Sequence, residues 1–261
     1  MIGFAIDMDG TVYRGERPIP GAAGFVDGLR ERGIPFRFLT NNSAHTRRFY
    51  SDRLRRIGID ATEDDVLTST LATVRFIEGE RPGRSVYAIA TPEVAEEVRA
   101  AGVPSAGEGR PDIVLLTFDT TIDYGKINRG YHHLLAGAEL IATHPDDVCP
   151  TEDSYDVDIG PFIRMYESLT KKEATVIGKP NRRMLEMASS EMGLPVKEVV
   201  MVGDRLSTDM RMAADAGARS VLVLSGETDM ELLRRSGMRP TFVARSVGDI
   251  IPELIDTRLI S

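Results

Sequence analysis

The stretch that decides the fold is Ile2-Gly3-Phe4-Ala5-Ile6-Asp7-Met8-Asp9-Gly10-Thr11, near the start of a chain of 261 residues. Its apolar first half is typical of a buried β-strand. Because side chains alternate along a strand, Asp7 and Asp9 are expected to project the same way at the strand's carboxyl end. Two carboxylates this close repel each other, and a bound cation is the usual relief. The alternatives are that one stays protonated or that the segment is a solvated turn.

The rest of the chain alternates apolar, strand-like runs with helical patterns. The expected strands cover 34–39, 86–90, 113–117, 139–142, 198–202 and 220–224. The expected helices cover 22–32, 93–101, 127–136, 206–216 and 229–236. This alternation predicts an α/β fold, in which a doubly wound parallel sheet is covered by helices on both faces.

Composition excludes several classes of protein. Apolar residues make up 42% and charged residues 28% of the chain, which is typical of a folded globular protein. A net charge of −8 argues against nucleic acid as a partner. The apolar runs are too short for a membrane span, and no secretory signal is expected at the N-terminus. The single cysteine, Cys149, rules out an intrachain disulfide and suits the reducing cytoplasm.

Polar residues form three further groups, two of which directly follow expected strands. Thr40-Asn41-Asn42-Ser43 suits a phosphate, or serves only to cap the next helix. Lys179, in Gly178-Lys179-Pro180-Asn181, precedes a helix whose first position would be Pro180; it is either a ligand for an anion or a surface lysine. Asp204 and Asp209 follow the strand at 198–202, where a cap explains one aspartate but not both. Together these groups fit phosphoryl transfer through an aspartyl-phosphate.

The same motifs resemble those of the haloacid dehalogenase (HAD) superfamily. The resemblance rests on Asp7-Met8-Asp9-Gly10-Thr11-Val12, Leu39-Thr40-Asn41-Asn42-Ser43, Gly178-Lys179-Pro180-Asn181 and Met201-Val202-Gly203-Asp204-Arg205-Leu206-Ser207-Thr208-Asp209. The closing segment Leu222-Val223-Leu224-Ser225-Gly226-Glu227-Thr228 also resembles this family. The whole chain is similar to subfamily IIA, the NagD-like and 4-nitrophenylphosphatase-like sugar or nucleotide phosphatases. The resemblance implies a Rossmann-like core with an inserted α/β cap domain of the C2 type.

The resemblance also implies a Mg²⁺-dependent phosphatase and a role for each motif residue. Asp7 would be the nucleophile and Asp9 the general acid and base. The implied metal ligands are Asp7, Asp9 (through its carbonyl), Asp204 and Asp209, the last directly or through water. The residues implied to hold the phosphoryl group are Thr40, Asn41 and Lys179.

The interval between Asn41 and Lys179 is far longer than one crossover needs, so the cap is expected there. We expect a discontinuous core over 1–75 and 177–261 and a cap over 76–176. Within the cap, the loop after the strand at 139–142 resembles the family's substrate-facing loop. Its candidate specificity residues are Thr143, His144, Asp146 and Cys149. Taken alone, His144 is most simply a surface histidine, and Asp158, where the chain departs from the family's glycine-rich pattern, is most simply a solvated acid.

The expected partner is a small phosphorylated metabolite, such as a sugar phosphate, glycerol phosphate, phosphoglycolate or a nucleotide. A homodimer is possible, because relatives form dimers through the cap. A phosphotransferase or phosphomutase would use the same phosphoenzyme. A receiver-type signalling module and an inactive HAD-like binding protein are the remaining alternatives, but the order of the acidic motifs and the complete catalytic set argue against them.

Overall fold

The computed structural model describes residues 2–151 and 154–250. The chain divides into two compact units. The first, the core unit, contains residues 1–40, 48–67 and 180–261, and the second, the cap unit, contains residues 41–47 and 68–179. The chain therefore crosses between the units four times. Residues 41–47, 68–75 and 177–179, which the sequence motifs assigned to the core, have most of their contacts in the cap unit.

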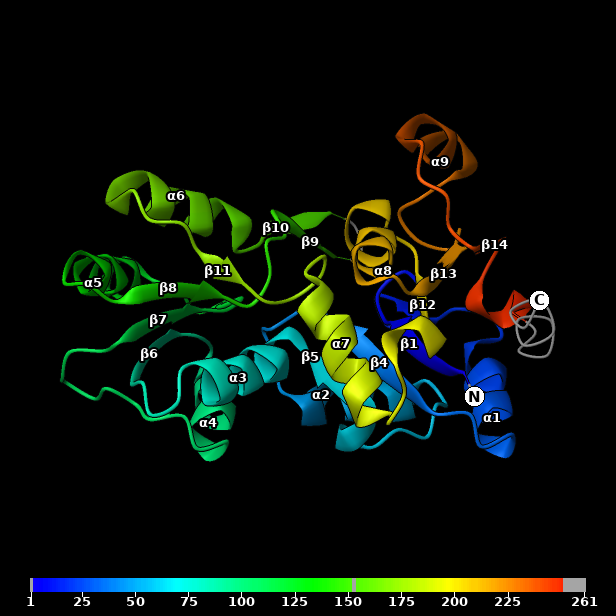
Figure 1. Ribbon diagram of the computed structural model, residues 1–261, viewed down its shortest axis with the longest axis horizontal. Coiled ribbons are helices and arrows are strands. Elements are labelled where there is room, and N and C mark those ends of the chain that lie inside the picture. Colours follow the sequence, from blue (N-terminus) through cyan, green and yellow to red (C-terminus); the bar gives the residue numbers. More distant parts are fainter. Residues whose placement is uncertain (1, 152–153, 251–261) are drawn as a thin grey trace. The chain divides into compact units, whose positions relative to one another are not determined.

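The core unit is built on a six-stranded sheet in the order β14-β13-β12-β1-β4-β5 (Figure 1). The strands are β1 (Gly3–Asp7), β4 (Phe36–Thr40), β5 (Val66–Thr68), β12 (Val199–Gly203), β13 (Arg219–Val223) and β14 (Phe242–Ala244). Neighbours from β14 to β4 pair in parallel. The two central strands, β1 and β12, are buried along their whole length. This explains why both read as continuous apolar runs.

Helices cover both faces of this sheet, as the alternating pattern predicts. α1 (Ala22–Glu31) and α2 (Arg47–Arg56) pack their apolar side chains against one face. α7 (Arg182–Glu191) and α8 (Arg211–Ala216) pack on the other face, against β1 and β13. α7 begins at Arg182, and Asn181 is its N-cap, because the Asn181 side chain accepts the Arg183 N–H at 3.0 Å. Pro180 therefore precedes the helix instead of occupying its first position.

Short elements complete the core unit. A hairpin of β2 (Tyr13–Arg14) and β3 (Arg17–Pro18) follows β1. A wide π-type turn, η3 (Leu206–Met210), leads into α8. The single-turn segments η1 (Glu63–Asp65), η2 (Val196–Glu198) and η4 (Val247–Asp249) precede β5, precede β12 and follow β14. α9 (Met230–Ser236) is capped by Asp229 and ends at Gly237, whose positive φ terminates the helix.

The cap unit has its own parallel sheet in the order β11-β8-β7-β6, formed by β6 (Val86–Ile89), β7 (Ile113–Leu116), β8 (Glu139–Ala142) and β11 (Thr175–Val176). α5 (Tyr124–Leu135) and α6 (Gly160–Thr170) cover one face. α3 (Ser69–Glu80) and α4 (Pro92–Ala100) lie on the opposite face (Figure 1). The hairpin of β9 (Val148–Pro150) and β10 (Tyr155–Val157) stands apart from this sheet.

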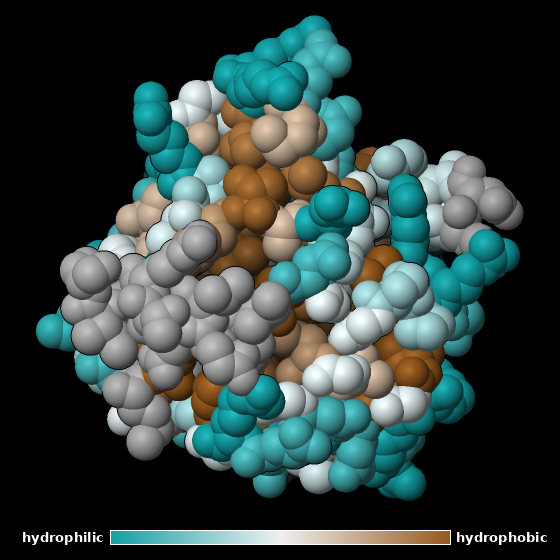
Figure 2. All heavy atoms as spheres, turned by 90° about the vertical axis from the view of Figure 1, so that its right-hand side faces the viewer, coloured by the Kyte–Doolittle hydropathy of each residue, from teal (hydrophilic) through white to brown (hydrophobic). Residues whose placement is uncertain are grey.

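The surface of the core unit around α9 and β14 mixes apolar and charged side chains, and Figure 2 shows an apolar band on this face. Met230 and Leu232 of α9 and Val243 of β14 are among the exposed apolar residues of the chain. Among the described residues, we find no helix with the length and apolar character needed to cross a membrane.

Candidate active site

Three buried carboxylates meet at the carboxyl end of the core sheet. Asp7 ends β1, and Asp204 follows directly after β12, the strand paired with β1 in parallel register. Asp209 lies in η3, the turn that follows. All three side chains are buried, and one oxygen from each lies within 4.8 Å of the others. The fold therefore brings together the acids that the sequence placed after two distant strands.

Burial and the neighbouring carboxylates disfavour the ionised form of Asp204 in this cluster. Burial, followed by the charges of Asp7 and Asp209, raises the pKa of Asp204 well above its usual range. The N–H of Glu227, which donates to Asp204 Oδ2 at 2.6 Å, and the Arg205 charge lower it. The other oxygen of Asp204, Oδ1, is buried and has no hydrogen-bond partner among the described residues. A buried acceptor without a partner is costly, and a cation would satisfy it.

Glycines enclose the carboxylates at distances that exclude a side chain. A Cβ on Gly226 would lie 1.9 Å from Asp204 Oδ2, and one on Gly10 would lie 2.4 Å from the same atom. Gly10 also has a φ of 81°, a conformation that favours glycine. A Cβ on Gly203 would lie 2.4 Å from Asp209 Cγ. These positions are glycine because two acidic side chains fill the space beside them.

Asp9 and Thr40 lie at the same edge of the core sheet as Asp7. The Tyr13 hydroxyl donates to Asp9 Oδ2 at 3.4 Å, and the Arg53 guanidinium stacks 4.3 Å from the Tyr13 ring. Burial, and then the Asp9 charge, raises the pKa of Tyr13 well above its usual range, so the hydroxyl keeps its proton and remains a donor. Thr40 ends β4, which pairs with β1 so that Leu39 faces Asp7, and it is buried.

Asn41 and Lys179 belong to the cap unit, where their contacts are extensive. The Asn41 side chain donates from Nδ2 to the Lys179 carbonyl and to Asp146 Oδ2, both at 2.9 Å. Its Oδ1 accepts the Lys179 backbone N–H at 2.8 Å. Ser69 Oγ donates to the Asn41 carbonyl at 2.6 Å. An asparagine amide has two N–H groups, so both are already used, and any donation from Asn41 to a phosphate would come from its backbone.

The candidate specificity residues of the cap lie on the loop between β8 and β9. Two expectations for this part of the chain were wrong. His144 is fully buried, not on the surface, because its ring bonds to Thr143 Oγ1 and to Asp158 Oδ1, each at 2.9 Å. Asp158 is buried, not solvated, for the same reason. Cys149, half-buried, faces the Asn42 side chain, whose Nδ2 lies 3.5 Å from Sγ.

Two groups of residues have the ligand atoms of a metal site. His144, Asp146 and Asp158 have atoms within 4.8 Å of one another, but protein partners satisfy each of them. The Asp7–Asp204–Asp209 cluster is different, because Asp204 Oδ1 has no hydrogen-bond partner among the described residues, and because burial and the neighbouring carboxylates raise the pKa of Asp204. An all-carboxylate set suits a hard cation such as Mg²⁺. These residues therefore fit the implied metal.

The structure adds residues to the site to which sequence reasoning gave no role. Ser225 Oγ donates to the Gly10 carbonyl at 2.7 Å, and Glu227 donates to Asp204 as described above. Arg205 forms an ion pair with Glu227 at 3.0 Å. The segment 222–228 resembled the family in sequence, but only the fold shows that it wraps around Asp204.

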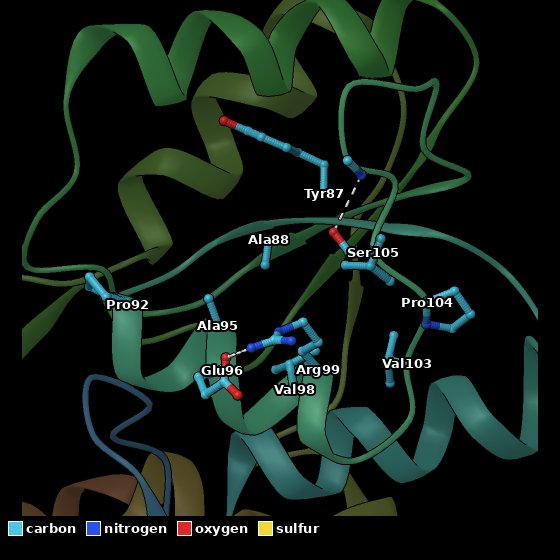
Figure 3. Close-up of a pocket in the computed structure, with 12 residues that line it drawn as sticks. Tyr87, Ala88, Pro92, Ala95, Glu96, Val98, Arg99, Val103, Pro104 and Ser105 are labelled. Atoms are coloured by element: carbon cyan, nitrogen blue, oxygen red, sulfur yellow. Dashed lines mark hydrogen bonds and ion pairs between the residues drawn. The ribbon is translucent and has the colours of Figure 1, made fainter.

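A separate hollow in the cap unit contains none of the predicted site residues. It has a volume of about 350 Å³ and is bounded by β6, α4 and the segment 103–107 (Figure 3). Its floor is apolar, and the Arg99 and Glu96 side chains form an ion pair across one side.

The fold and the carboxylate cluster are those of a HAD-like hydrolase, and comparison with known families agrees. A model described as haloacid dehalogenase-like hydrolase matches residues 4–104, and a HAD-hydrolase-like model matches residues 176–250. The chain belongs to this family and, within it, to the NagD-like phosphatases of subfamily IIA. It is thus a HAD-type phosphatase.

Individual relatives match over almost their whole length. The 5'-nucleotidase YutF of Bacillus subtilis is 34% identical over 250 residues, which are 96% of this chain and 97% of the relative. An acid sugar phosphatase of Staphylococcus aureus is 32% identical over 96% of this chain and 97% of its own. Among solved structures, a 4-nitrophenylphosphatase from Thermotoga maritima has a TM-score of 0.91 at 35% identity and 95% coverage of both chains. NagD from E. coli has a TM-score of 0.89 at 26% identity, covering 96% of this chain and 98% of its own.

Proposed function

We propose that this phosphatase hydrolyses small organic phosphomonoesters in a Mg²⁺-dependent reaction, through an aspartyl-phosphate on Asp7. The observation that carries the proposal is the buried Asp7–Asp204–Asp209 cluster, in which one oxygen of Asp204 has no partner among the described residues. A bound cation would relieve the repulsion among these carboxylates and between them and a phosphate.

The proposed first step transfers the phosphoryl group to the protein. A carboxylate oxygen of Asp7 attacks phosphorus, and the bond from phosphorus to the ester oxygen breaks. Asp9, in its protonated form, gives its proton to the departing oxygen. The Tyr13 hydroxyl bonds to Asp9 Oδ2 and so restricts the orientation of this carboxyl group.

The proposed second step returns the protein to its starting state. Asp9, now a carboxylate, takes a proton from water as that water attacks the phosphorus. The bond between phosphorus and Asp7 breaks, which releases inorganic phosphate and the Asp7 carboxylate. Thr40, the backbone N–H of Asn41 and the Lys179 ammonium group would hold the phosphoryl oxygens during both steps.

Asp7, Asp204, Asp209 and the carbonyl of Asp9 are the proposed holders of Mg²⁺. When bound there, the ion would neutralise the acidic cluster and the phosphoryl oxygens. Asp209 accepts the Arg205 N–H at 3.2 Å, which fixes its carboxylate near Asp204. The position of these two carboxylates after β12 supports their proposed role as partners for Asp7.

The names of the relatives, which refer to nucleotides, sugar phosphates and 4-nitrophenyl phosphate, support a proposal for the substrate class. We infer that the substrate here is likewise a small phosphorylated metabolite. A phosphotransferase or phosphomutase would share the first step but pass the phosphoryl group to a hydroxyl other than water. Phosphorus NMR of the products separates these outcomes.

The test measures phosphate release from 4-nitrophenyl phosphate in EDTA and in Mg²⁺. Activity is expected only with Mg²⁺, and Asp7→Asn should abolish it because an amide cannot act as the nucleophile. Asp215→Asn, which removes an exposed carboxylate of the core unit, is the matched control and should retain full activity. Turnover by Asp7→Asn at the wild-type rate would refute the nucleophile assignment. Failure of beryllofluoride with Mg²⁺ to bind the wild type would argue against the phosphoenzyme.

A further inference from the structure

His144 is the one buried histidine of the four in the chain, all of which lie within the described residues. Its Nε2 lies 2.9 Å from Asp158 Oδ1, which also accepts the Ile159 N–H at 2.7 Å. A carboxylate only accepts, so Nε2 carries a proton and donates it to Asp158. The pair joins the start of the β8–β9 loop to the residue that precedes the N-cap of α6.

A continuous line of hydrogen bonds extends from the other side of the ring. His144 Nδ1 lies 2.9 Å from Thr143 Oγ1, which lies 2.9 Å from Ser43 Oγ. Ser43 Oγ accepts the Phe118 N–H at 2.8 Å. Ser43, Thr143 and His144 are fully buried and Asp158 nearly so. Buried polar groups that are all satisfied rigidify the segments they join.

The start of the β8–β9 loop, which these hydrogen bonds hold in place, contains Asp146, two residues after His144. The Asp146 carbonyl accepts the Gly160 N–H at 2.8 Å, and its Oδ2 accepts from Asn41 Nδ2 at 2.9 Å. The packing here is tight, because a Cβ on Gly160 would lie 2.2 Å from Asp147 Oδ1. Displacing the start of α6 would therefore displace Asp146.

Asn41 links Asp146 to Lys179 through hydrogen bonds. Asn41 Oδ1 accepts the Lys179 backbone N–H at 2.8 Å, and Asn41 Nδ2 donates to the Lys179 carbonyl at 2.9 Å. A Cβ on the preceding residue, Gly178, would lie 2.7 Å from Asn41 Oδ1. Asn41 therefore holds both backbone groups of Lys179, and Asp146 holds the Asn41 amide.

We propose that the buried His144–Asp158 pair is a positioning element for the phosphate-binding residues Asn41 and Lys179, acting through Asp146. The pair touches no reacting atom. Its role in catalysis rests on the proposed function, but the placement of Asn41 and Lys179 is a property of the folded cap unit. The two parts can therefore be measured separately.

The decisive comparison is Asp158→Ala against Asp158→Asn. The asparagine keeps an oxygen that can accept from His144 and from Ile159, whereas alanine removes the acceptor. Asp158→Ala should shift the NMR signals of the Asn41 side-chain amide and the Lys179 backbone amide, whereas Asp158→Asn should leave them near their wild-type positions. The His144 Nε2 proton should exchange slowly with water in the wild type and in Asp158→Asn and be lost from the spectrum of Asp158→Ala.

The kinetic arm uses 4-nitrophenyl phosphate with Mg²⁺. A misplacement of about 1 Å at a reacting group can cost roughly 100-fold in rate, so a partial displacement should lower kcat/KM in Asp158→Ala by about tenfold. Asp158→Asn should stay within about twofold of the wild type. His133→Asn, at a half-exposed histidine of α5, is the matched control and should change neither the kinetics nor the amide signals.

Three results would overturn the proposal. The first is unmoved Asn41 and Lys179 signals in a folded Asp158→Ala. The second is an equal loss in Asp158→Asn and Asp158→Ala, which would make the charge and not the hydrogen bond responsible. The third is a rapidly exchanging Nε2 proton in the wild type. If Asp158→Ala does not fold, His144→Leu, which removes the donor of the same pair, takes its place with the same expected shifts. A wild type without Mg²⁺-dependent activity would refute the proposed function, while the NMR arm would still decide the placement.

Discussion

Replacing Asp204 with asparagine tests whether the acidic cluster is a metal site that is strained when no metal is bound. Asp204 is buried beside Asp7 and Asp209, and its Oδ1 has no partner among the described residues. The asparagine side chain would keep an oxygen that accepts from Glu227. It would also present N–H groups to the neighbouring carboxylates and remove one of three like charges. We therefore expect Asp204→Asn to be more stable than the wild type in EDTA.

The size of this gain in stability can be worked out from Asp204 Oδ1, the buried oxygen that has no partner among the described residues. A buried acceptor left without a partner costs about 1–3 kcal/mol, and more when it is charged. For a chain of this length, 1 kcal/mol shifts Tm by roughly 2–4 °C. Thermal unfolding followed by circular dichroism in EDTA at pH 8 should therefore show a gain of roughly 2–12 °C. Asp215→Asn, the exposed control, should stay within about 0.5 kcal/mol of the wild type.

The stability difference between Asp204→Asn and the wild type should increase with pH. The pKa of Asp204 is raised in the folded, metal-free protein, mainly by burial. Because the folded pKa lies above the unfolded one, the wild type loses stability as pH rises through the folded pKa. The advantage of Asp204→Asn should be largest at alkaline pH and shrink as the pH is lowered past that value.

Magnesium should reverse the order of stability. A ligand at 100 times its Kd stabilises the folded state by about 2.7 kcal/mol, so the wild type should gain from Mg²⁺. Asp204→Asn, which lacks a ligand, should gain much less. The reasoning is refuted if Asp204→Asn is the less stable protein in EDTA at pH 8, or if Mg²⁺ stabilises both proteins equally.

The remaining predictions concern the groups around this cluster. Asp9→Asn should lower kcat by about 10²–10⁴-fold for an alkyl phosphate and by less for 4-nitrophenyl phosphate, whose leaving group needs no proton; equal losses in steady-state assays would contradict the acid role. Gly226→Ala should lower the free energy of unfolding by about 1–3 kcal/mol and impair turnover, because its Cβ would lie 1.9 Å from Asp204 Oδ2. Gly24→Ala in α1, with no atom near the new Cβ, should instead stabilise the protein by about 0.4–1 kcal/mol. Urea titration measures the free energy of unfolding of both variants.

Most of the architecture was predictable because it depends on local periodicity. The apolar runs at 2–6 and 198–202 lie within one residue of β1 and β12. Strand β5 and the hairpin β9–β10 were not predicted, because each strand is only three residues long and neither shows a clear period. Segment 222–228 was recognised by its resemblance alone. Its contacts with Asp204 depend on a loop that closes only when β12 and β13 pair.

The loop between β8 and β9 shows why the burial of a residue could not be predicted from the sequence. His144 was expected at the surface because histidine in a polar loop usually lies there. Its partner Asp158 is 14 residues away, and Ser43, which bonds to Thr143, is 100 residues from it. No local sequence pattern indicates a contact between residues that lie so far apart in the chain.

The sequence by itself determined the class of chemistry, because aspartates placed directly after buried parallel strands must gather at one edge of a sheet. Its alternating apolar runs likewise determined the α/β fold. Only the tertiary structure decided which side chains are engaged: that Asp204 retains an oxygen without a partner among the described residues, that the Asn41 amide is spent on Lys179 and Asp146, and that His144 and Asp158 are buried together. The physical reason is that burial and hydrogen-bond partners arise from segments distant in sequence, whereas strand and helix periods arise from neighbouring residues.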